Sequence, residues 1–119
     1  MIKVIEGLPD HVAAFRASGN ITGKDYDKVV NPRVLEVYKK YVKINYLMYI
    51  ESSLFAFNAE ACMKDAVLGF VYFTEWRKVA IVHGEGVKRF TNFFGRFLPG
   101  RYYGFTPSEL QDALDWVSK

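Results

Sequence analysis

Few side chains in this sequence have the types and spacing that catalysis or metal binding requires. His11 and His83 have no second ligand or base at helical spacing, and no Ser-His-Asp order can be assigned from spacing. Cys62 lies among apolar residues of a predicted helix, where we expect a small buried hydrophobic side chain. One cysteine and two histidines exclude an internal disulfide and are too few for a structural zinc site. We therefore expect a non-enzymatic protein with no cofactor and no metal.

Two short segments carry groups that could contact or hold a phosphate. Residues 83–86, His-Gly-Glu-Gly, separate a predicted strand from a predicted helix, but their glycine spacing matches neither common nucleotide-binding fingerprint. Ser52 and Ser53 follow a predicted strand, and a phosphate on either hydroxyl would be stabilised by the dipole of the next helix. We expect a plain turn at the first segment. At the serines, an ordinary polar loop and a phosphorylation switch stay open as alternatives.

The strongest signal is aromatic and basic. The predicted helix over residues 86–98 has phenylalanines over a wide arc and basic side chains opposite them, as a basic amphipathic helix does. Residues 76–104 contain six basic residues and one acidic residue, whereas residues 1–75 contain nine of each. One interpretation is that the phenylalanines pack on a sheet while the basic groups face water. The other is an apolar pocket or exposed groove that serves a ligand, a membrane surface or a partner.

The second interpretation places the site between two Phe-rich helices, predicted over residues 59–74 and 87–98, together with the aromatic loop before the first of them. The candidate ligand pocket would be lined by Phe55, Phe57, Met63, Val67, Phe70, Phe90, Phe94 and Phe97. An acidic head group or a membrane would be contacted by Lys88, Arg89, Arg96 and Arg101. The sequence thus favours binding of an apolar or amphipathic, lipid-like molecule.

An alternating α/β fold would position these residues. Hydrophobic periodicity and turn residues predict strands over residues 2–5, 11–18, 43–50, 77–83 and 101–105. They predict helices over residues 23–41, 58–74, 86–98 and 107–117. Pro32 either kinks the first helix or divides it in two. This order favours a mixed, mainly parallel sheet of about five strands with four helices, in which the first two strands form an antiparallel hairpin at one edge.

Length and composition limit the class of protein. The chain has 119 residues, of which 50% are hydrophobic and 24% charged, so we expect one folded domain over residues 1–119. A net charge of +3 is too small to indicate nucleic-acid binding. No segment approaches the roughly eighteen consecutive apolar residues of a membrane span, and residues 1–6 lack a signal-peptide pattern. We expect a cytoplasmic protein, with peripheral membrane contact left open.

Five segments carry a family resemblance: IEGLPDHVAAFRASGNITGKDYDKVVNP, KINYLMYI, EWRKVAIV, FFGRFLPG and FTPSELQDALDWV. On these segments the chain, from residue 2 to 118, resembles the SpoIIAA-like family, a branch related to STAS domains whose fold is compared with the CRAL-TRIO lipid-exchange fold. The resemblance implies the α/β fold and a non-enzymatic binding module of largely unassigned role. In STAS antagonists of anti-sigma factors, a serine in an Asp-Ser-Ser-Gly-type turn is phosphorylated, and this chain has Glu51-Ser52-Ser53-Leu54 near that place.

Two functions from different classes follow. The preferred one is binding of an apolar or amphipathic molecule, or of a membrane surface, between the two Phe-rich helices. The alternative is a bacterial-type, STAS-like regulatory protein that docks a protein partner through the face of Ser52 and Ser53. The expected partners are a lipid or other apolar small molecule, a membrane surface or a protein, and not nucleic acid. Homo-oligomer formation stays open.

Anionic lipid vesicles should bind the protein more strongly than neutral ones, because Lys88, Arg89 and Arg96 lie beside the phenylalanine side of one predicted helix. Each basic group near such a surface contributes about 1 kcal/mol. Added salt should weaken the binding, because the Debye length falls from about 10 Å at about 0.1 M to about 3 Å at about 1 M. Vesicle co-sedimentation measures the effect. Absent binding at low salt, or binding unchanged when all three residues become glutamine, would contradict the membrane-surface interpretation.

Overall fold

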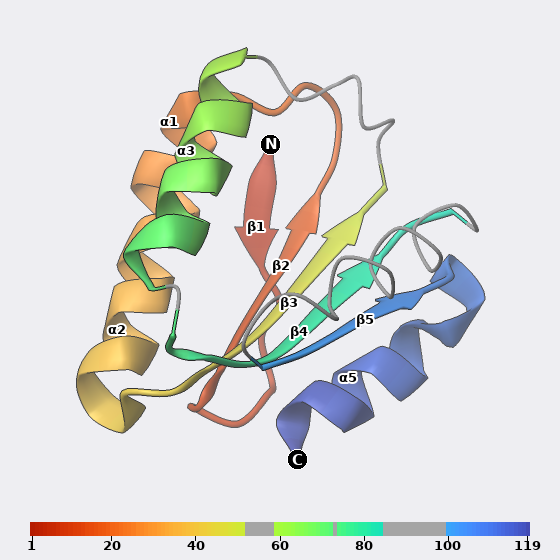
Figure 1. Ribbon diagram of the computed structural model, residues 1–119. Helices are drawn as coiled ribbons and strands as arrows, with labels where there is room; N and C mark the ends of the chain where they lie inside the picture. The colour runs from red at the N-terminus through yellow and green to blue at the C-terminus, as the bar shows by residue number, and fades with distance from the viewer. Residues whose placement is uncertain (52–58, 73, 85–99) are drawn as a thin grey trace.

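A computed structural model describes residues 1–51, 59–72, 74–84 and 100–119, apart from the side chains of residues 59, 62, 66 and 70. Five strands form one sheet, and helices lie against both of its faces (Figure 1). The strands are β1 (Ile2–Val4), β2 (Val12–Ala17), β3 (Ile44–Ile50), β4 (Trp76–Val82) and β5 (Arg101–Phe105). The helical segments are α1 (Gly23–Asp25), the π-helical turn η1 (Tyr26–Val30), α2 (Asn31–Tyr41), α3 (Ala59–Val71), the short 3-10 turn η3 (Pro107–Glu109) and α5 (Leu110–Ser118).

The strands follow the chain order β1-β2-β3-β4-β5 across the sheet. β1 pairs antiparallel with β2, and the other three pairs of neighbours are parallel. The prediction of a mainly parallel α/β sheet with an antiparallel hairpin at one edge is therefore confirmed. The predicted loop over residues 52–58 and the predicted helix over 86–98 lie outside the described residues. None of the helices in the described part of the chain combines the length and apolarity that a membrane span requires.

The chain from Gly23 to Tyr41 is helical throughout but changes its pitch. The turn η1 stands between α1 and α2, and the N–H of Asn31 donates to the carbonyl of Tyr26, five residues earlier. Pro32 follows as the second residue of α2. In a regular helix its ring would collide with the carbonyl one turn earlier, and the wider turn relieves that contact. The predicted division at Pro32 is thus present as a change of helix type, and it makes Tyr26 the first residue of the wide turn.

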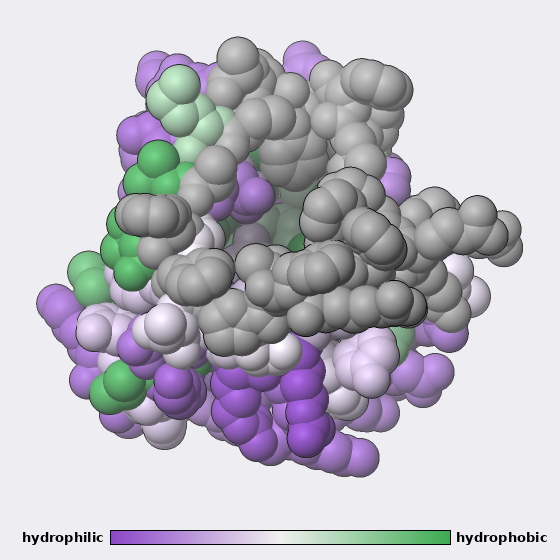
Figure 2. Space-filling model, in the orientation of Figure 1, coloured by the Kyte–Doolittle hydropathy of each residue, from purple (hydrophilic) through white to green (hydrophobic). Residues whose placement is uncertain are grey.

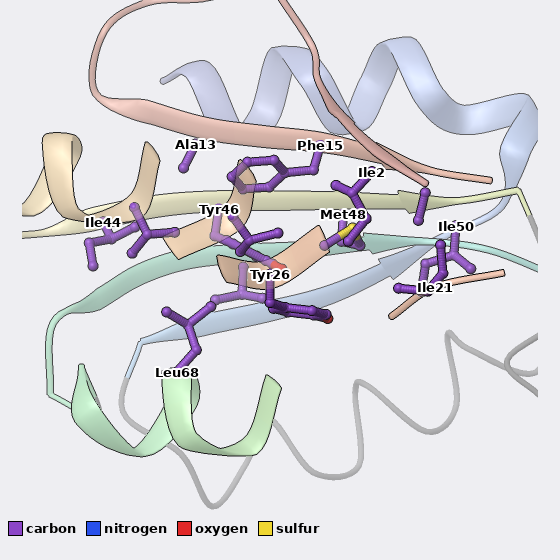
Figure 3. Packing of buried hydrophobic residues seen from close by; sticks show 14 of the residues in the cluster. Ile2, Ala13, Phe15, Ile21, Tyr26, Ile44, Tyr46, Met48, Ile50 and Leu68 are labelled. Atoms are coloured by element: carbon purple, nitrogen blue, oxygen red, sulfur yellow. The ribbon is translucent and has the colours of Figure 1, made fainter. Parts of the chain in front are cut away.

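Each face of the sheet has its own hydrophobic core. Alternate residues of β3 point to opposite faces, so Tyr46 and Met48 join the cluster under η1, α2 and α3, while Leu47 joins the cluster under α5. Figure 3 shows the first cluster, in which Phe15 of β2 and Tyr26 lie near Tyr46. Apolar side chains fill both faces, as a parallel sheet covered on both sides requires.

Two buried polar side chains hold the end of α5 on the sheet. Asn45 of β3 is 2% exposed, and its Nδ2 donates to the carbonyl of Val117 over 2.7 Å. Lys78 of β4 is 7% exposed, and its Nζ donates to the carbonyl of Trp116 over 2.9 Å. Burial lowers the pKa of Lys78. The last carbonyls of a helix have no partner within it, and a positive group there is favoured by the helix dipole, so both side chains complete the end of α5.

Asn45→Ala should lower the free energy of unfolding by about 1–3 kcal/mol, because it leaves the carbonyl of Val117 without its buried donor. Denaturant unfolding of the variant and the native protein measures the difference. Asn20→Ala, at an exposed position outside the sheet, is the matched control and should change the free energy of unfolding by no more than about 0.5 kcal/mol. Equal stability of the two variants would show that Asn45 does not anchor α5.

Candidate functional site

One acidic residue interrupts the apolar inner side of α3. Ala61 and Leu68 are buried in the core cluster, and Tyr72, just after α3, packs against that cluster. Asp65 stands between Ala61 and Leu68 at i, i+4 and i+7 spacing, so it shares their side of the helix. Unlike Ala61 and Leu68, it is exposed to solvent. Asp65 therefore gives α3 an acidic group that solvent reaches on the side of the helix that packs on the sheet.

The Asp65 carboxylate accepts a hydrogen bond from a buried tyrosine. The hydroxyl of Tyr26, the first residue of η1, donates to Oδ1 of Asp65 over 2.9 Å. Although the side chain has access to solvent, protein atoms surround its carboxyl group closely enough for burial to raise the pKa, and the hydrogen bond from Tyr26 offsets part of that effect. The bond joins residues 39 positions apart in the sequence and so fixes α3 against η1.

Tyr46 of β3 adds a second phenol to this group. Its side chain is 6% exposed, and its ring centre lies 5.5 Å from that of Trp76 and 5.7 Å from that of Phe15. In Figure 3 the side chains of Tyr46 and Tyr26 lie close together between the sheet and α3. Burial raises the pKa of Tyr46 well above its usual range, and the charges of Tyr26 and Asp65 add to the effect. In the part of the chain that the structure describes, no group hydrogen-bonds the Tyr46 hydroxyl.

Figure 2 shows hydrophobic side chains over α3, at the left edge of the molecule, next to hydrophilic ones. On the sheet face that carries α3, Ile81 of β4 and Tyr102 of β5 are only half-buried. We call Tyr26, Tyr46 and Asp65 the Asp65 site. Its polar groups thus share a sheet face with an incompletely covered apolar surface. That combination suits a molecule with an apolar body and a polar end.

The site residues predicted from the sequence fall into three groups in the structure. Met63 and Val67 are 67% and 53% exposed, and with Val71 they form an apolar stripe on the outer side of α3. The structure therefore does not bring Met63 or Val67 to the Asp65 site. Arg101 is exposed at the start of β5. Outside the described residues and side chains lie Ser52, Ser53, Phe55, Phe57, Phe70, Lys88, Arg89, Phe90, Phe94, Arg96 and Phe97.

Both histidines have structural contacts. Nδ1 of His83, just after β4, lies 2.9 Å from the carbonyl oxygen of Ile50. The ring of His11 meets that of Tyr41 edge-on, with 6.1 Å between the ring centres. No group of three or more His, Cys, Asp or Glu side chains among the described residues could hold a metal ion.

The sequence patterns miss all three residues of the Asp65 site. Tyr26 and Tyr46 fit the predicted apolar sides of a helix and a strand, which gives no sign that their hydroxyls matter. Asp65 carries a usable signal, because a charged residue at the spacing that joins Ala61 to Leu68 must lie on their side of the helix. A charge on an apolar stripe is therefore the feature that could have found this site.

The comparisons with known proteins concern almost the whole chain. A model of the SpoIIAA-like family matches residues 12–118. Among solved structures, the chain is similar to that of an uncharacterized protein of the DUF3478 family from Shewanella loihica, which has a SpoIIAA-like fold. The identity is 26%, the match covers 98% of this chain and 92% of that chain, and the TM-score is 0.65. No curated protein matches this chain. The family resemblance and the fold class predicted from the sequence are thus confirmed.

Asp65→Asn should become more stable, relative to the native protein, as the pH rises from about 4 to about 7. Burial raises the pKa of Asp65 above its ordinary value of 3.8, so in the pH range between the two values the folded state binds more protons than the unfolded state. Ionisation of Asp65 therefore costs stability as the pH rises through its folded-state pKa. Asparagine keeps an acceptor for Tyr26 and does not ionise. Denaturant unfolding at several pH values measures the difference.

The control is Asp115→Asn, at an exposed position on α5, which should retain the pH dependence of the native protein. If the stability of Asp65→Asn ran parallel to that of the native protein at every pH, the carboxyl group of Asp65 would not be desolvated in the folded state.

Proposed function

This chain belongs to the SpoIIAA-like family, and we propose that it is a non-enzymatic module that binds an apolar or amphipathic molecule on the α3 side of its sheet. One observation supports this role above all: Asp65 is exposed on the inner side of α3, close to the buried phenol of Tyr46. A few polar groups beside an incompletely covered apolar surface are typical of small-molecule sites.

Apolar surface would supply most of the affinity. Ile81 and Tyr102 offer half-buried side chains on the same face of the sheet as Tyr46. Each methylene group removed from water contributes about 0.8 kcal/mol, so a chain of about ten carbons would contribute about 8 kcal/mol before the cost of lost translational and rotational freedom. Measurable binding therefore requires only that part of this favourable free energy remain after the cost of lost freedom is subtracted.

The chemistry of the Asp65 site supports binding rather than catalysis. Burial raises the pKa of Tyr46, so its hydroxyl keeps its proton at neutral pH and serves as a hydrogen-bonding group rather than as a base. One carboxylate oxygen of Asp65 already accepts a hydrogen bond from the Tyr26 hydroxyl. These groups can orient a ligand without reacting with it.

The exposed stripe of Met63, Val67 and Val71 supports a second form of the same role, contact with a membrane surface. Apolar side chains on the outer side of a helix lose their contact with water when the helix lies on lipid. A module that takes up a lipid-like molecule from a membrane would use both this stripe and the Asp65 site. Docking of a protein partner through Ser52 and Ser53 remains the alternative proposal, and it concerns residues outside the described ranges.

The two tryptophans can report on the two faces of the sheet. Trp76 contacts Tyr46 in the cluster under α3, whereas Trp116 packs against the cluster under α5. A brominated decyl alcohol bound on the α3 side should quench the fluorescence of Trp76, because bromine quenches at close contact. Trp116→Phe, which keeps Trp76, should therefore be quenched at concentrations that leave Trp76→Phe nearly unchanged.

Circular dichroism of both variants checks that they are folded. If neither folded variant is quenched, or if both are quenched equally, binding on the α3 side is refuted.

A further inference from the structure

We infer that the polar end of the bound molecule is a hydrogen-bond donor, either a hydroxyl or an ammonium group. This group would hydrogen-bond both Asp65 and Tyr46. This inference rests on the proposed function and specifies which amphipathic molecules the Asp65 site accepts. It depends on two separate observations, the unused acceptor capacity of Asp65 and the Tyr46 hydroxyl, which no described group hydrogen-bonds.

Asp65 has acceptor positions that the described protein does not use. An ionised carboxylate offers about four lone-pair positions on two oxygens. Among the described residues only the Tyr26 hydroxyl donates to this carboxylate, at Oδ1. The neighbouring cation, Lys64, pairs instead with Asp27 over 3.0 Å. Asp65 therefore carries to the surface beside α3 a negative charge that no described cation neutralises.

Tyr46 presents a second polar group close by. Its side chain is 6% exposed, and no described group hydrogen-bonds its hydroxyl. The hydroxyl is not among the fully buried side-chain atoms that lack a partner, so it keeps a small contact with solvent, where a ligand can take the place of water. A ligand hydroxyl can donate a hydrogen bond to the Asp65 carboxylate and accept one from the Tyr46 hydroxyl. An ammonium group can donate to the Asp65 carboxylate and to the hydroxyl oxygen of Tyr46.

The same arrangement disfavours an anion. A carboxylate or phosphate would bring a second negative charge against Asp65, whereas a hydroxyl or ammonium group gains a charge-assisted hydrogen bond. This differs from the acidic head group that the sequence predicts from its basic residues. The net charge of +3 attracts anions to the protein at long range, but it does not change the sign of the charge inside the site.

Three decyl compounds of one chain length test the inference. Decylamine, decanol and decanoate are compared at neutral pH, below their micelle concentrations, by displacement of a neutral apolar fluorescent dye. Decylamine and decanol should displace the dye at concentrations about tenfold lower than decanoate. Decanol also partitions from water more readily than decanoate, so variants of the site decide the cause of the preference.

Asp65→Asn should bind the dye as the native protein does but lose most of its preference for decylamine over decanoate. Tyr46→Phe should weaken the binding of decanol more than that of decanoate. The matched control is Asp115→Asn, which removes an exposed carboxylate on α5 and should keep the native preference.

If decanoate competes as well as decylamine, or if the preference for decylamine survives in Asp65→Asn, the inference is overturned, while binding of the dye leaves the proposed function standing. If neither the dye nor any decyl compound binds the folded native protein, both are overturned.

Discussion

The hydrogen bond from the Tyr26 hydroxyl to Asp65 is the contact on which the α3 side of this protein depends. A carboxylate on the inner side of a helix loses hydration, and burial raises its pKa accordingly. A phenol can offset that loss only if it reaches the same place, and Tyr26 does so from the π-helical turn before Pro32. α1 also approaches α3 closely, because a Cβ on Gly23 would meet the side chain of Glu60. The helix geometry of one segment thus sets the position of another.

The two faces of the sheet are closed in different ways. Under α5, Asn45 and Lys78 donate to the last carbonyls of the helix, so the polar groups of that face satisfy one another within the fold. Under α3, the Tyr46 hydroxyl has no described partner and Asp65 keeps access to solvent. On the α5 side these polar groups bond within the protein. On the α3 side, polar groups have hydrogen-bonding capacity that the described residues do not use. This difference is the physical basis for proposing that a molecule binds on the α3 side.

Local patterns predict the strands and the hairpin edge, because each depends on neighbours within a few residues. They do not predict the Asp65 site, because its three residues come from separate elements that meet only in the folded chain. The same patterns predict that Met63 and Val67 line a ligand pocket. Apolar residues occur on most sides of α3, so periodicity alone could not tell that these two would lie on the exposed side.

Carbon NMR of a labelled Asp65 carboxyl group tests most directly whether this residue meets the polar end of a ligand. The carboxyl resonance is titrated with pH in the free protein and again with saturating decylamine. We expect a pKa above the ordinary value of 3.8 in the free protein and a lower pKa once the ammonium group is bound, because an opposite charge favours the ionised carboxylate. A carboxyl group that titrates at its ordinary value and does not respond to decylamine would contradict the role of Asp65 as the polar contact of the site.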